Sequence, residues 1–182
     1  VITLYGGNQE TQLTDGAHTD TMQIIPNGVD VERYGNIARR NNKVPTIAMI
    51  GRVVPIKDVK SFIRACAAIK ESLGELNAYI MGNTDEDPDY FEECKELSAH
   101  LLLDDVIEFT GAVTIDDYLP SVDVVVFTSV SEAQPLVILE AGAAGIPVVA
   151  TRVGACEEMI LGAQSESPQL GAGGAVVPLS NP

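Results

Sequence analysis

The chain has 182 residues, 46% of them hydrophobic, and a formal net charge of −15, which is enough apolar material for one substantial core. So acidic a chain argues against nucleic acid and anionic membrane surfaces as partners, because both favour clustered lysine and arginine. No apolar run is long enough to span a bilayer and no leader-like segment opens the chain, so we expect a cytoplasmic protein.

Runs rich in β-branched residues alternate with helical patterns along most of the chain. Strands are predicted at 46–50, 77–81, 106–109, 122–127, 147–151 and 175–178. Helices are predicted between them at 57–73, 88–102, 116–119, 135–144 and 155–161. Near-continuous apolar strands separated by helices are typical of a parallel sheet covered on both faces. We therefore predict an α/β fold with a Rossmann-like doubly wound parallel sheet.

One domain is expected, formed by residues 24–182. Residues 1–23 are polar and weakly patterned, and we interpret them as a linker or as the edge of a missing amino-terminal domain.

Two turns have the chemistry of an anion site, because ligands of such sheets bind where strands end and helix amides are exposed. In GRVVPIKD, at 51–58, a glycine turn is followed by Arg52 and then by Lys57 at the mouth of a helix. Two cations there predict a pocket for a phosphate group. In SEAQPLVILE, the proline at the helix start leaves the amides of Leu136 and Val137 free for an anion.

Glu132 and Glu140 lie eight residues apart in this second segment, and Glu140 is the only charged residue from 135 to 150. An ionised group in an apolar segment needs compensating contacts, so Glu140 predicts a polar ligand or cation. Glu132 is also compatible with a solvated carboxylate near a helix N-terminus. Arg52 and Lys57 taken alone are compatible with surface charges, and only the glycine turn and the order of the segments favour a site.

Three other patterns do not indicate sites. An acidic run resembles a calcium loop, with Asp85, Asp87, Asp89 and Glu96. However, Tyr90 occupies the position that needs glycine. The GAGGA run at 171–175 precedes a strand, which is the wrong context for a dinucleotide fingerprint. The odd number and wide spacing of the cysteines predict neither disulfides nor a zinc site; they are Cys66, Cys94 and Cys156.

Several segments in this order resemble one family: IPNGVD at 25–30, GRVVPIKD, FTG at 109–111, and EAQPLVILE followed by AGAAGIPVVATRVGACEE. Over residues 24–178 the chain resembles the carboxyl-terminal, donor-binding domain of retaining group 1 glycosyltransferases with the GT-B fold. Its GRVVPIKD and TDEDPDYFEEC segments are similar to those of exopolysaccharide glycosyltransferases of the Pel type. The resemblance implies transfer of a hexose, glucose from UDP-glucose, to a growing exopolysaccharide, with no cofactor and no metal.

The resemblance also assigns roles. It implies that Arg52 and Lys57 hold the diphosphate and, with Glu132 against the sugar, carry catalysis. It gives the ribose hydroxyls to Glu140 and the base to backbone groups of the loop around Val113. The amides of Leu136 and Val137 remain the anion ligands predicted from the turn itself.

Partners follow in the same way: a nucleotide-sugar, a polysaccharide acceptor bound through a domain missing from this chain, and, as a candidate, a membrane-bound synthase complex. The fragment alone is expected to lack turnover. Two departures from the family pattern are Ala133 in place of glycine and Gly142 in place of methionine. The alternatives are a nucleotide-binding module without transfer activity and a Rossmann oxidoreductase, the latter disfavoured because no G-x-G-x-x-G joins a strand to a helix.

Overall fold

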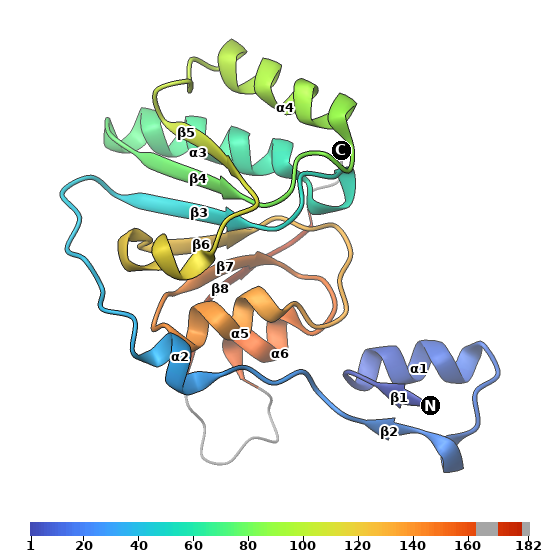
Figure 1. Cartoon of the computed structure of the whole chain (residues 1–182). Coiled ribbons are helices and arrows are strands. Elements are labelled where there is room, and N and C mark those ends of the chain that lie inside the picture. Colours follow the sequence, from blue (N-terminus) through green and yellow to red (C-terminus); the bar gives the residue numbers. More distant parts are fainter. Residues whose placement is uncertain (163–170, 180–182) are drawn as a thin grey trace.

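The structure is a computed structural model and describes residues 1–162 and 171–179. It contains a twisted sheet with helices on both faces and, apart from it, a small unit formed by the first residues of the chain (Figure 1). The segments 163–170 and 180–182, which belong to the predicted domain, lie outside the described residues.

The large sheet has six parallel strands in the order β5-β4-β3-β6-β7-β8. Their bounds are β3 Thr46–Ile50, β4 Asn77–Met81, β5 Ile107–Gly111, β6 Val124–Phe127, β7 Val148–Thr151 and β8 Gly174–Val177. In the central strand, Ile47 lies opposite Ala78 of β4 and Val124 of β6. The chain winds from β3 outward to β5 and then crosses to β6, so the strand order reverses between β3 and β6. This confirms the predicted doubly wound sheet, and ligands of such sheets bind at the point where the strand order reverses.

Two cores lie on opposite faces of the sheet. One packs the sheet against α3 (Val59–Leu73) and α4 (Pro88–His100), and the other packs it against α2 (Val31–Gly35), α5 (Leu136–Ala143) and α6 (Cys156–Leu161). Side chains of a strand alternate between faces, and β6 follows this rule. Its Val125 and Phe127 belong to the core under α5, whereas Val124 and Val126 pack against the core under α3.

The short helix predicted at 116–119 is wrong. Two single 3₁₀ turns, η3 (Ile115–Asp117) and η4 (Leu119–Ser121), stand there instead. Pro120 lacks an N–H and restricts the residue before it, so a continuous α-helix cannot run through this segment. Such tight turns are the usual form of short helical pieces.

The first residues form β1 (Ile2–Thr3), α1 (Gly6–Thr14), η1 (Thr19–Thr21) and β2 (Gln23–Ile24), with β1 and β2 parallel. The sequence predicted no regular element here. The reason is that α1 buries none of its residues, so it has no apolar face to produce a periodic signal. That this segment is a linker or the edge of another domain stays a prediction.

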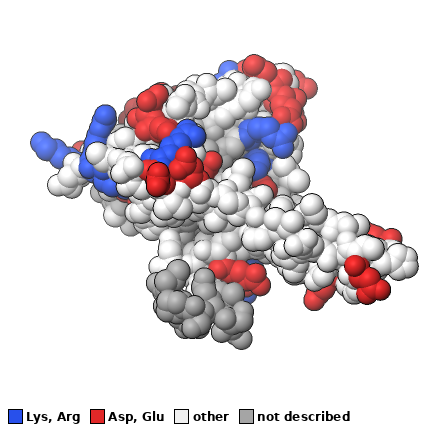
Figure 2. All heavy atoms as spheres, turned by 60° about the horizontal axis from the view of Figure 1, so that its bottom comes forward, with Lys and Arg blue, Asp and Glu red and all other residues white. Residues whose placement is uncertain are grey.

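Charge is unevenly distributed over the surface. Residues 1–25 contain no lysine or arginine, and in Figure 2 the unit they form carries only acidic charges, whereas basic and acidic side chains interleave on the sheet domain. An anionic ligand therefore meets positive charge only at the places on the sheet domain where lysine or arginine side chains lie. No helix among the described residues is both long and apolar enough to cross a membrane.

Candidate functional site

The turn after β3 lies tightly against the turn after β4. Gly51 follows β3, and its N–H donates to the Met81 carbonyl oxygen at 2.8 Å. A Cβ on Gly82 would lie 2.0 Å from the Gly51 oxygen, so only glycine permits this approach. The glycine turn recognised in the sequence therefore holds Arg52 beside the loop that follows β4.

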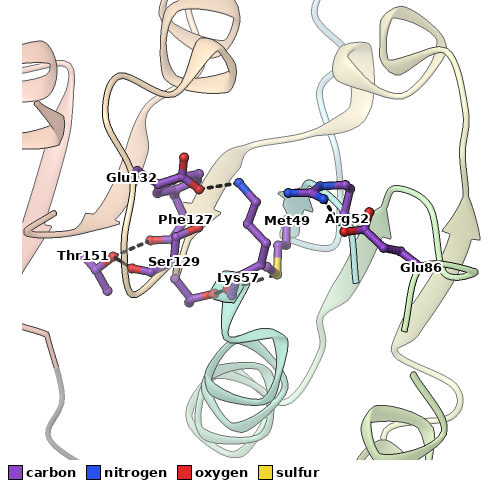
Figure 3. Close-up of polar contacts among 9 residues, drawn as sticks. Met49, Arg52, Lys57, Glu86, Phe127, Ser129, Glu132 and Thr151 are labelled. Carbon is purple, nitrogen blue, oxygen red and sulfur yellow. Dashed lines mark hydrogen bonds and ion pairs between the residues drawn. The ribbon is translucent and has the colours of Figure 1, made fainter. Parts of the chain in front are cut away.

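Lys57 and Glu132 form an ion pair at the point where the strand order reverses (Figure 3). Lys57 ends the 3₁₀ turn η2 (Pro55–Lys57) after β3, and Glu132 lies in the loop after β6. Their side chains are 16% and 18% exposed. The lysine Nζ also lies 5.5 Å from the centre of the Phe127 ring, a cation–π distance. Two largely buried charges thus compensate each other where the resemblance puts the diphosphate and the sugar.

Backbone contacts join the same two segments. The Thr128 hydroxyl donates to the Lys57 carbonyl oxygen at 2.9 Å, and the Val130 N–H donates to the Ile56 oxygen at 2.9 Å. The position of Lys57 relative to the loop after β6 is therefore fixed by the main chain as well as by charge.

Arg52 pairs with Glu86, which lies in the acidic segment before α4 (Figure 3). Both side chains are about half exposed, at 53% and 46%. The hydrogen bond that Arg52 donates to Glu86 raises the pKa of the Arg52 guanidinium, and the negative charges of Glu86 and Glu132 raise it further. In Figure 3 the Arg52 and Glu86 pair lies beside the Lys57 and Glu132 pair.

The loop that carries Glu132 is supported from the turn after β7. Gly154 has a φ of +52°, and a Cβ on it would lie 2.3 Å from the Glu132 carbonyl oxygen. The Ala155 N–H donates to the Ala133 oxygen at 2.8 Å. A second support comes from Asn27, whose N–H and side-chain amide donate to the side-chain and main-chain oxygens of Gln134 at 2.5 and 2.8 Å.

Glu140 is partly buried on α5 and accepts a hydrogen bond of 3.0 Å from the hydroxyl of Tyr34 on α2. Burial raises the pKa of Tyr34, and the hydrogen bond to Glu140 raises it further, so the hydroxyl stays protonated as a donor. The sequence predicted a polar ligand or cation beside Glu140. One polar partner of this carboxylate is Tyr34, a residue of the chain itself.

The remaining predicted residues lie at the same edge of the sheet. Pro135 is the N-cap of α5, so Leu136 and Val137 begin the helix, and their amides have no acceptor within it. Val113 lies in the loop after β5 and packs, half-buried, against the core that contains Tyr34. The nucleotide contacts expected of these three residues stay predictions.

The acidic run after β4 has a structural role. Asp87 is the N-cap of α4 and accepts from the Tyr90 N–H at 3.0 Å. Across residues 1–162 and 171–179, no group of His, Cys, Asp and Glu side chains is arranged to hold a metal ion.

Sequence reasoning missed four contributors: Tyr34, Glu86, Asn27 and Gly154. Three of them belong to segments quoted for the resemblance, so their position in a motif was the available signal: Asn27 in IPNGVD, Glu86 in TDEDPDYFEEC and Gly154 in AGAAGIPVVATRVGACEE. Tyr34 carried no signal that distinguished it from a core residue, since its partner Glu140 lies 106 positions away in the sequence. Together the site offers two cations, free helix amides and two carboxylates, which can bind an anion bearing hydroxyl groups.

This fold is a doubly wound α/β domain, and its candidate site combines two cations with free helix amides. Residues 44–179 match the family described as "Glycosyl transferases group 1". The chain therefore belongs to this family, and its sheet is the Rossmann-like sheet of a GT-B glycosyltransferase.

Individual proteins of known name or structure are also similar to this chain. A D-inositol 3-phosphate glycosyltransferase from Pseudarthrobacter chlorophenolicus is 32% identical over 158 residues, covering 80% of this chain and 37% of the relative. The chain thus spans about a third of the length of the curated relatives it matches. The C-terminal domain of a group 1 glycosyl transferase from Francisella tularensis is 27% identical with a TM-score of 0.66, covering 83% of this chain and 80% of that one. The Anabaena protein HepE, solved with UDP-glucose, is 24% identical with a TM-score of 0.77, covering 87% of this chain and 46% of that one, and this likeness shows the fold.

Proposed function

We propose that this chain is the donor-binding domain of a cytoplasmic glycosyltransferase that transfers glucose from UDP-glucose to a growing exopolysaccharide with retention of configuration. The observation that carries the proposal is the ion pair of Lys57 with Glu132 at the switch point of the sheet, with Arg52 beside it (Figure 3). A cation suited to a diphosphate and an acceptor suited to sugar hydroxyls lie together there. The binding of UDP-glucose by the structural neighbour HepE supports this choice of donor.

In the proposed reaction, Arg52 and Lys57 bind the diphosphate and stabilise the charge that develops as it leaves the sugar. Free amides at the start of α5, those of Leu136 and Val137, add dipoles of the same sign. Glu132 accepts from hydroxyls of the sugar, and Glu140 accepts from the ribose. The chain's contribution to the chemistry is thus electrostatic.

The acceptor is a polysaccharide in this proposal. The similarity of GRVVPIKD and TDEDPDYFEEC to Pel-type enzymes supports it, whereas the curated relatives are named for D-inositol 3-phosphate. We assign acceptor binding to a further domain, and a membrane-bound synthase complex is a candidate partner. The 182-residue chain alone then binds donor without turnover.

Isothermal titration calorimetry of the chain with UDP-glucose, UDP-galactose, GDP-glucose, ADP-glucose and NAD tests the proposal. UDP-glucose is expected to bind most tightly. Tighter binding of a GDP or ADP sugar would change the donor within the same function. Binding of NAD alone would overturn the proposal in favour of an oxidoreductase, and binding of none would overturn it altogether.

A further inference from the structure

Tyr34 holds one oxygen of Glu140. The two residues are 106 positions apart in the sequence, and the tyrosine hydroxyl lies 3.0 Å from the glutamate Oε1. An ionised carboxylate has two oxygens and about four acceptor positions. A donor fixed on one oxygen therefore restricts the rotation of the group and leaves the other oxygen for a ligand.

The tyrosine ring is itself fixed. Tyr34 is 5% exposed and belongs to the core cluster that includes Ile138 and Ala141 of α5. A Cβ on the next residue, Gly35, would lie 3.6 Å from the Ala143 carbonyl oxygen, so α2 rests directly on α5. The hydroxyl is the polar end of an otherwise apolar side chain, and the ring cannot move without opening the core.

Helix α2 is also anchored at its start. Asp30 is its N-cap and accepts from the Arg33 N–H at 2.9 Å. The Arg33 guanidinium forms two hydrogen bonds of 2.8 Å with Asp116, which lies in η3 beyond Val113. One short helix thus connects the base loop predicted around Val113 with the glutamate predicted to hold the ribose.

We propose that Tyr34 is a positioning residue that fixes the Glu140 carboxylate for the ribose hydroxyls of the nucleotide, an inference that rests on the proposed function. The hydroxyl occupies one acceptor position of Oε1 and orients the group before the ligand binds, so less conformational freedom is lost on binding. Tyr34 itself need not touch the nucleotide. Its effect is confined to ligands that carry the hydroxyls.

The variant Tyr34→Phe tests this, because it keeps the ring and removes only the donor. Calorimetric affinities are measured for UDP and for 2′,3′-dideoxy-UDP, which lacks the hydroxyls. We expect Tyr34→Phe to weaken UDP about three- to tenfold, as for loss of one hydrogen bond, and to leave dideoxy-UDP unchanged. Tyr79→Phe is the matched control, since its ring packs against the same core cluster, and it should change neither affinity.

A double-variant cycle with Glu140→Ala separates positioning from a general effect on stability. In the Glu140→Ala background, Tyr34→Phe should no longer weaken UDP. Equal losses for UDP and dideoxy-UDP, or additive losses in the cycle, overturn the proposal. If the native chain binds UDP and Tyr34→Phe binds it equally well, only the role of Tyr34 fails; if the native chain binds no nucleotide, the proposed function fails with it.

Crystal structures of the two proteins without nucleotide give a second readout that does not depend on binding. A single Glu140 conformer in the native protein and several in Tyr34→Phe support the proposal. An identical single conformer in both contradicts it.

Discussion

The Lys57 ammonium and the Glu132 carboxylate neutralise each other across 75 positions of sequence, at the edge of the sheet where β3 and β6 end. Each charge is more than four-fifths buried and would be costly without the other. On binding of a nucleotide-sugar, we expect the lysine to exchange this partner for the diphosphate and the glutamate to exchange it for sugar hydroxyls. The pair therefore keeps two ligand-binding groups in place while the site is free.

Removal of either cation should weaken UDP. The chain has a net charge of −15, so a diphosphate is repelled by its negative potential, and few positive charges offset that repulsion. We expect Arg52→Ala and Lys57→Ala each to lose about 1.5–3 kcal/mol, roughly ten- to a hundredfold in affinity. Lys60→Ala is the control, because Lys60 pairs with Glu93 outside the site. Native-like UDP affinity in both site variants would mean that the diphosphate binds elsewhere.

The two glutamates should differ in what they recognise. Glu140→Gln is expected to weaken UDP and UDP-glucose alike, by about 1–3 kcal/mol, because both ligands carry the ribose. Glu132→Gln should weaken UDP-glucose but not bare UDP, because only UDP-glucose carries the sugar that Glu132 is proposed to contact. The substitution also frees Lys57 from its ion pair, so it does not hinder binding of the diphosphate. Paired calorimetric titrations check this, with thermal melting to establish folding. A loss of bare UDP in Glu132→Gln as large as that of UDP-glucose contradicts the assignment.

Glu86 should compete with the diphosphate for Arg52. The ion pair is exposed, and such pairs contribute about 0.2–1 kcal/mol. Glu86→Gln is therefore expected to raise UDP affinity by about two- to fivefold, most clearly at low salt. Glu93→Gln removes a carboxylate of a comparable exposed pair away from the site and should leave affinity unchanged. A weaker affinity in Glu86→Gln would show that this carboxylate assists binding.

Gly154→Ala should damage both stability and sugar recognition. A positive φ costs an alanine roughly 1–2 kcal/mol, and here the new Cβ must also displace the Glu132 carbonyl from 2.3 Å. Gly145→Ala isolates the first effect, because Gly145 also has a positive φ, +68°, and open space around it. We expect the melting temperature and the UDP-glucose affinity to fall further in Gly154→Ala. Equal behaviour of the two variants would remove the support we assign to this turn.

The sheet could be predicted from the sequence because its strands are short, strongly apolar runs between clear helical patterns. Thr46–Ile50 and Asn77–Met81 were predicted with the bounds that the structure has, since a glycine follows each run, Gly51 and Gly82. The α1 helix could not be predicted, because it buries no residue and so has no periodic signal. The sequence has a helical pattern at 116–119, but Pro120 prevents a continuous α-helix there, and two 3₁₀ turns form instead.

The residues of the candidate site could be named from the sequence, and their roles stay predictions, but their pairing could not be predicted. Arg52, Lys57, Glu132 and Glu140 were identified from turns, charge and resemblance. That Lys57 meets Glu132 depends on β3 and β6 being neighbours, which the order of elements along the chain does not specify. The contact of Tyr34 with Glu140 depends in the same way on α2 returning to α5.

A crystal structure of the chain with UDP-glucose tests the central claim most directly. We predict that the diphosphate lies between Arg52 and Lys57, that the Lys57–Glu132 pair is broken, and that Glu132 accepts from the glucose while Glu140 accepts from the ribose. A nucleotide bound away from the carboxyl ends of β3 and β6, with the Lys57–Glu132 pair intact, would contradict the account.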